Sequence, residues 1–227
     1  MLSTDEFKAW AKDVVLLCHI TTRIEGKKDD DLLGRKGGGG FPYIVALDAE
    51  GRVTATLEGG RDVAGFTEMM KKGAEYAAKK AKADLPAAEA LELFLFDVEV
   101  GNLDLAGARE AAAKMKDLSD DQRKRVAGAL LDKEIGAVLE GIRKGTPEEK
   151  QAAGKAFAEM WKAGAEPDPD GRSFQPYYIL MLDHAEATKD VALFEKALGV
   201  VRGKFGDNPQ AAGFFQKQDE RLKKMKE

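Results

Sequence analysis

Short apolar runs rich in β-branched residues are confined to the first third of this chain of 227 residues. They are Val14–Ile20, Tyr43–Leu47 and the alternating stretch Arg52–Leu57. From Leu85 onward the apolar residues recur only at the intervals of a helix. This change of pattern predicts an α/β fold that gives way to an all-α fold. We therefore expect one domain over residues 1–83 and a second over residues 85–227.

The first domain is predicted to contain a small sheet. Val14–Ile20 has the composition of a strand that is buried on both faces, as in a parallel sheet. The stretch 48–51 reads Asp-Ala-Glu-Gly, a tight-turn signal in which Gly51 can adopt positive φ. It predicts a hairpin between the other two runs. A helix over 62–83 is expected to cover the sheet, and the preceding Gly37–Gly40 is interpreted as a turn. The apolar face of that helix is expected to carry Val63, Phe66, Met70, Gly73 and Ala77.

The second domain is predicted to consist of antiparallel helices. Thr146 and Glu149 have the spacing of a capping box, and Pro147 stands at a first helical position. The breaks between helices are short, which favours antiparallel neighbours. Stretches 101–108 and 188–198 resemble the turn of a tetratricopeptide-type hairpin, although the period of about 34 residues is not met. The helices are expected near 86–100, 104–116, 120–143, 147–163, 175–187, 190–204 and 209–225.

The stretch Phe41–Val53, within Phe7–Met70, resembles the second half of a thioredoxin-like domain. A glycine-rich turn, Phe-Pro, a strand, an Asp-x-x-Gly turn, a second strand and a closing helix follow one another in the order of that family. The resemblance is to the bacterial branch that includes the disulfide-interchange proteins. It implies a cis-proline at Pro42, which would face a binding loop that also holds Gly40 and Phe41. It further implies a truncated three-layer unit.

The chain departs from that family at its reactive centre. The chemistry requires a low-pKa thiolate and a second, resolving thiol, and Cys18 is the single cysteine. The family's first strand and Cys-x-x-Cys helix precede the part that is matched. Two arrangements follow. The strand at 14–20 pairs directly with the strand at 43–47 in a three-stranded sheet, or another chain or an upstream segment fills the gap between them.

Cys18 has two interpretations. Within an apolar strand, a free cysteine behaves as a small buried hydrophobe. The alternative is a reactive single thiol, which would make the chain a redox sensor and would need an exposed sulfur. His19 would point to the opposite face of the strand, so a Cys–His nucleophilic pair is poorly arranged.

Composition excludes several classes of protein. With 36 basic and 40 acidic residues, the net charge of −4 argues against a general binder of nucleic acid. One cysteine and two histidines give no metal-ligand spacing, and neither a metal nor another cofactor is expected. No apolar stretch approaches the roughly 20 residues that span a bilayer. The first residues do not read as a signal peptide, so the chain as written is expected in the cytoplasm. A further N-terminal segment would make it periplasmic or exported.

The aromatic residues of the C-terminal region offer a second candidate site. Phe174, Tyr177 and Tyr178 stand at helical spacing, which is typical of a core, but helical repeats also bind partner peptides in grooves. The leading hypothesis is a redox-inactive thioredoxin-like protein whose helical domain binds protein or peptide, with a homodimer through an open sheet edge as a further prediction. The alternative is part of a thiol–disulfide oxidoreductase whose Cys-x-x-Cys segment lies upstream. Whether the chain is an enzyme stays open.

Overall fold

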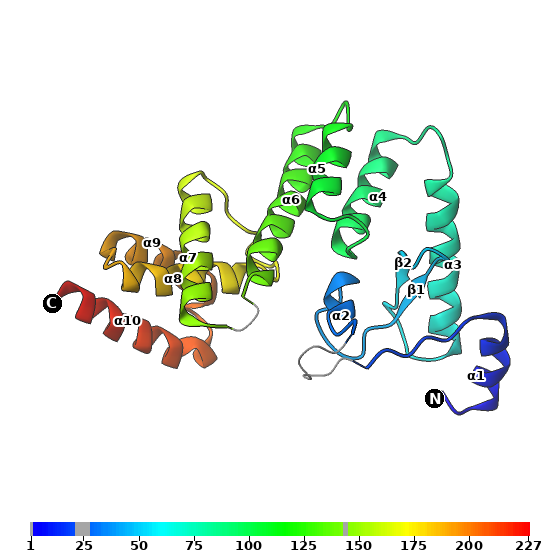
Figure 1. Cartoon of the computed structure of the whole chain (residues 1–227), viewed down its shortest axis with the longest axis horizontal. Helices are drawn as coiled ribbons and strands as arrows, with labels where there is room; N and C mark the ends of the chain where they lie inside the picture. Colours follow the sequence, from blue (N-terminus) through cyan, green and yellow to red (C-terminus); the bar gives the residue numbers. More distant parts are fainter. Residues whose placement is uncertain (1, 21–27, 143–144) are drawn as a thin grey trace. The chain divides into compact units, whose positions relative to one another are not determined.

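The structure is a computed structural model that describes residues 2–20, 28–142 and 145–227. Within those ranges it is mostly helical, with ten α-helices and one small antiparallel sheet (Figure 1). The chain divides into two compact units, Met1–Val126 and Ala127–Glu227. Each unit holds a hydrophobic core of its own.

The sheet of the first unit is a hairpin of two strands. Strand β1 (Val45–Leu47) pairs with β2 (Val53–Thr56) in antiparallel register, with Ala46 opposite Ala55. The pairing shifts by one residue directly after Ala46. Gly51 has a φ of 76°, in the left-handed region that a glycine adopts without a steric penalty. The hairpin and its turn therefore form where the sequence predicts them.

The prediction of a third strand at Val14–Ile20 is wrong. Val14 is extended, with φ −134° and ψ 152°, but residues 15–20 adopt no strand and form no bridge to another described residue. A strand exists only where its N–H and C=O groups meet a partner strand, and β1 is paired with β2 alone in the described sheet. The sheet consequently has two strands rather than the expected three.

Helix α3 (Val63–Lys80) packs against both strands of the hairpin (Figure 1). Phe66, Met69 and Gly73 are its buried residues. Met70, which was expected on this face, is instead 38% exposed because the buried stripe runs through its neighbour Met69. Helix α3 thus covers the sheet as predicted, but Met69 takes the buried place that was expected for Met70.

The N-terminal helix α1 (Asp5–Trp10) completes the small core of the first unit. Its Phe7 and Trp10 rings lie 5.7 and 5.4 Å from the ring of Phe66. Three tilted aromatic rings at these distances combine burial of a large apolar area with favourable edge contacts. A 3-10 turn, η1 (Ala11–Asp13), then leads into the extended segment.

Three further helices belong wholly or partly to the first unit. Helices α4 (Ala87–Glu99) and α5 (Leu105–Ala113) form a hairpin, and α6 (Asp120–Glu140) begins in this unit. Arg125 of α6 makes a bidentate pair with Glu92 of α4, at 2.7 and 3.1 Å. These helices lie within three residues of the predicted bounds at both ends.

Two glycines bring the loop after α2 (Leu32–Arg35) into backbone contact with the end of α4. Gly37 and Gly101 have φ values of 76° and 75°. A Cβ on Gly37 would lie 2.6 Å from the carbonyl oxygen of Glu99, and one on Gly101 would lie 2.2 Å from that of Arg35. No larger residue fits at either position. The predicted glycine turn is therefore a packed contact.

The second unit is a set of helices whose end signals are those predicted from the sequence. The capping box of Thr146 and Glu149 is formed, with both reciprocal hydrogen bonds at 3.1 to 3.2 Å, and Pro147 begins the following helix. A 3-10 turn, η2 (Pro209–Ala211), precedes the last helix. The helices are α7 (Pro147–Lys162), α8 (Phe174–Ala187), α9 (Val191–Phe205) and α10 (Ala212–Lys226).

The boundary between the two units lies inside α6, rather than at the expected junction near residue 84. Asn102, in the turn between α4 and α5, donates to the carbonyl oxygen of Val53 and accepts from its amide, both at 2.8 Å. These bonds fix the α4–α5 hairpin to strand β2. The first two helices of the predicted all-α domain are therefore part of the α/β unit.

Candidate functional site

Residues 15–20 present the apolar side chains of Val15, Leu16, Leu17 and Ile20 to solvent, with Cys18 and His19 between them. Val15 is 98% exposed and Leu17 is 71% exposed, and every residue from 15 to 20 is exposed. The segment contains no charged residue. Contiguous apolar side chains in solvent are uncommon in soluble proteins and mark interaction sites.

Cys18 lies in the middle of this exposed segment. Its thiol is free and exposed, which corrects the expectation of a buried cysteine. The expectation depended on a strand covered on both faces, and that strand does not form. His19 is exposed as well. The chain has no second cysteine, so the sulfur is open to a reagent but has no resolving thiol within the chain.

The Gly40-Phe41-Pro42 loop has the backbone geometry that the resemblance implies. The Phe41–Pro42 peptide bond is cis. The Phe41 side chain is 73% exposed, and Gly40 and Pro42 are exposed as well. Directly after the loop, the Tyr43 hydroxyl donates to the carbonyl oxygen of Lys36 at 2.7 Å. The first unit thus presents a second exposed apolar side chain at a defined turn.

A buried polar cluster joins α3, β2 and the α4–α5 turn. The Asp97 carboxylate, whose side chain is 4% exposed, accepts hydrogen bonds from Tyr76 at 2.5 Å, Lys80 at 2.6 Å and Asn102 at 2.9 Å. Burial, followed by the bond to Asp97, raises the pKa of the Tyr76 hydroxyl. With three donors around one carboxylate, the cluster is suited to holding elements together rather than to moving a proton.

Sequence reasoning missed this cluster, although it left a signal. Asp97 interrupts the apolar face of α4, on which Leu91, Phe94 and Val98 are buried. A charged residue on such a face is rarely fully buried unless it is paired. Its partners Tyr76 and Lys80 come from α3, 21 and 17 positions away, so no local spacing could have named them.

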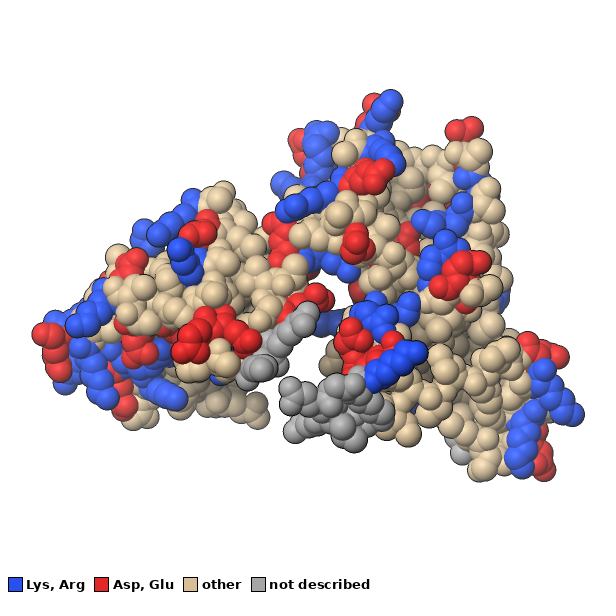
Figure 2. All heavy atoms as spheres, viewed as in Figure 1, with Lys and Arg blue, Asp and Glu red and all other residues tan. Residues whose placement is uncertain are grey.

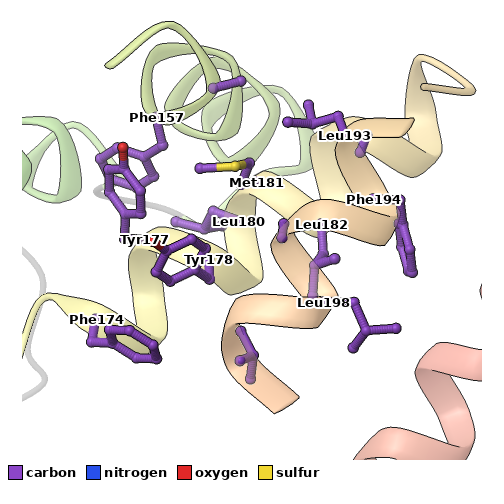
Figure 3. Packing of buried hydrophobic residues seen from close by; sticks show 14 of the residues in the cluster. Phe157, Phe174, Tyr177, Tyr178, Leu180, Met181, Leu182, Leu193, Phe194 and Leu198 are labelled. Carbon is purple, nitrogen blue, oxygen red and sulfur yellow. The ribbon is translucent and has the colours of Figure 1, made fainter. Parts of the chain in front are cut away.

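The proposed aromatic groove of the second unit is not formed. Phe174, Tyr177 and Tyr178 are at most 3% exposed, and all three point into the core between α7, α8 and α9 (Figure 3). The Tyr177 hydroxyl donates to the carbonyl oxygen of Ala165 at 2.7 Å. Burial raises the pKa of Tyr178 to about 12. Helical spacing places these rings on one face, and the packing of α8 between two helices turns that face inward.

A shallow groove of about 600 Å³ lies between α9 and α10. Arg202 at its wall is paired with Asp219 at 2.6 Å and stands 5.2 Å from the centre of the Phe215 ring. Its guanidinium is therefore already neutralised within the unit. The groove is lined by Arg202, Gly206, Ala212, Phe215, Gln216, Asp219, Glu220 and Lys223.

The charged side chains of the surface are mixed in sign. Figure 2 shows Lys and Arg interspersed with Asp and Glu on the face that it draws. In the described ranges, no three His, Cys, Asp or Glu side chains are grouped as metal ligands would be. None of the helices in those ranges is both long enough and apolar enough to cross a membrane.

Comparison with other proteins adds no family to this picture. No protein-family model, curated protein or solved structure matches the chain.

Proposed function

We propose that this protein acts by binding another polypeptide, and that Val14–Ile20 is the contact segment. The observation that carries the proposal is the exposure of six consecutive uncharged residues, four of them Val, Leu or Ile. At roughly 25 cal/mol per Å² of apolar surface, covering such a row is a substantial driving force for association.

The chemistry of the segment favours a partner in extended conformation. Within the described part of the chain, the backbone groups of residues 15–20 make no hydrogen bond to another backbone group. An incoming strand can form a ladder of hydrogen bonds with these groups. Alternate side chains would then lie on the two faces of the sheet that forms. The β-branched and leucine side chains of the segment suit such a surface. The contact we propose is therefore β-strand addition.

We further propose that the first unit is a redox-inactive member of the thioredoxin-like fold. The order of the extended segment, the β1–β2 hairpin and the covering helix α3 supports this origin, and the single cysteine provides no dithiol. The helical second unit would then serve as a repeat-like scaffold. The proposed contact lies in the first unit because the second unit buries its aromatic residues.

The test is binding of a fluorescent peptide with alternating valine and threonine between lysine ends, measured by fluorescence anisotropy. We expect binding to the native chain and roughly tenfold weaker binding to Leu17→Lys. Met70→Lys, which changes an exposed apolar residue of α3, is the matched control and should bind normally. A peptide with N-methyl groups on every amide lacks the ladder donors on both of its edges and should not bind. Equal affinity of native protein and Leu17→Lys would contradict the proposal.

A further inference from the structure

The sequence of the contact segment is suited to pairing with itself. If two copies pair as antiparallel strands with Leu17 opposite Leu17, then Leu16 faces Cys18 and Val14 faces Ile20 of the other copy. One face of the ladder would carry only these apolar side chains, four from each copy. Apolar and β-branched cross-strand pairs of this kind stabilise a sheet.

The charges next to the segment favour the antiparallel arrangement. Lys12 and Asp13 directly precede it, and both are exposed. In a parallel pair each would lie close to its own copy, which is repulsive. In an antiparallel pair the two Lys12–Asp13 ends lie at opposite ends of the ladder. Charge therefore selects one of the two orientations.

The segment also lacks the features that keep edge strands apart. Natural edges that must not associate carry Lys, Pro or a bulge, and residues 14–20 contain neither Lys nor Pro. When two identical segments pair about a two-fold axis, the exposed segment of each copy is covered and the assembly ends at a dimer. We infer that the partner of Val14–Ile20 is the same segment of a second copy, paired as antiparallel strands centred on Leu17. This inference depends on the proposed contact at Val14–Ile20.

Cys18 provides a reporter because it is exposed and is the sole cysteine of the chain. In the register centred on Leu17, the two Cys18 residues are diagonal neighbours, roughly 7–8 Å apart. A nitroxide attached to each would show strong dipolar broadening in its electron paramagnetic resonance spectrum. Diluting labelled chains with an excess of unlabelled chains should remove the broadening.

The experiment combines that spectrum with sedimentation equilibrium of the unlabelled chain of 24.7 kDa. We expect the native chain to be a dimer. The dissociation constant of the dimer should be at least about tenfold higher for Leu17→Lys and for Val15→Lys than for the native chain. Met70→Lys should have the dissociation constant of the native chain. Both substitutions are at exposed positions, and if one variant fails to fold, the other still tests the inference. A dimer that both variants leave intact, or a dimer without broadening, would overturn the inference.

A chain that remains a monomer would also overturn self-pairing. If that monomer binds the valine–threonine peptide through Leu17, the proposed function stands and only the identity of the partner changes. If it binds neither the peptide nor a second copy, the proposed function fails together with the inference.

Discussion

Gly154 of α7 lies against the backbone of α8. A Cβ at this position would stand 2.2 Å from the carbonyl oxygen of Leu180, so the backbones must separate to admit it. We expect Gly154→Ala to lower the free energy of unfolding by about 1–3 kcal/mol. Gly199→Ala in α9 is the matched control, because open space surrounds it, and it should stabilise the chain by about 0.5–1 kcal/mol. Chemical denaturation measures both, and a neutral Gly154→Ala would refute the close approach.

Asp97 is expected to be the most sensitive polar residue of the first unit. Removing its buried carboxylate leaves Tyr76, Lys80 and Asn102 without their shared acceptor. We expect Asp97→Ala to lower the free energy of unfolding by about 2–4 kcal/mol. Because Lys80 is half exposed, this loss is smaller than for an ion pair that is buried on both sides. Glu110→Ala breaks an exposed pair with Lys114 and should leave the free energy of unfolding nearly unchanged. Equal effects would show that the cluster contributes no more than a surface pair.

His184 should make the second unit sensitive to acid. Burial and then the charges of Lys155 and Lys162 lower its pKa, and Gln151 contacts its Nδ1 at 2.8 Å. The unfolded imidazole has a pKa of about 6.5, so below this pH the unfolded state binds more protons than the folded one. Stability is therefore fully present above about pH 6.5 and falls as the pH drops toward the lower folded value.

The comparison of two histidine variants tests this dependence. Denaturation curves between about pH 7 and pH 5 should show a smaller loss of stability for His184→Gln than for the native chain. His19→Gln, in the exposed segment, should leave the loss unchanged. A native-like pH profile in His184→Gln would show that another group causes it.

At the scale of elements, the cap of α7 carries a separable part of the stability. The Thr146 hydroxyl accepts from the Glu149 amide at 3.2 Å, and Thr146→Ala should lower the free energy of unfolding by about 1 kcal/mol. Thr67 is the matched control, since its hydroxyl bonds to the Val63 carbonyl oxygen inside α3. Thr67→Ala should stay within about 0.5 kcal/mol of the native chain. Thermal unfolding distinguishes the two, and equal values would mean that the capping box adds nothing.

Elements whose signals are local could be predicted from the sequence. The Thr146 cap and the turn glycine Gly51 act within a few residues, and the elements that they delimit lie where expected. The segment Val14–Ile20 shows the limit of this reasoning. Its composition has the propensity of a strand, but a strand is a property of a pair, and the pairing partner is not encoded in the segment itself.

The candidate site was less predictable than the helices. Helical spacing correctly put Phe174, Tyr177 and Tyr178 on one face, but whether that face meets solvent or α7 depends on long-range packing. The same holds for Cys18, whose exposure follows from a strand that does not form. Both wrong predictions, of the groove and of the buried thiol, have one physical cause: burial is decided by contacts between residues that are distant in the sequence.

At the scale of the whole molecule, each unit contains one of the two tryptophans. Trp10 packs at the edge of the first core and Trp161 at the edge of the second. We expect Trp10→Phe and Trp161→Phe chains to report the unfolding of one unit each. Asp97→Ala should lower the midpoint seen by Trp10 and leave that seen by Trp161 unchanged. Identical shifts at both tryptophans would show that the units unfold as one.

The bonds between Val53 and Asn102 also bear on how the first unit is synthesised. The two residues are 49 positions apart, so the hairpin leaves the ribosome well before the turn that fastens it. At typical elongation rates of 5–20 residues per second, the delay is roughly 2–10 s. That interval is far longer than the microseconds in which a hairpin forms. For those seconds the nascent hairpin lacks the Asn102 side chain that bonds to Val53, and an isolated hairpin of two strands is marginally stable at best.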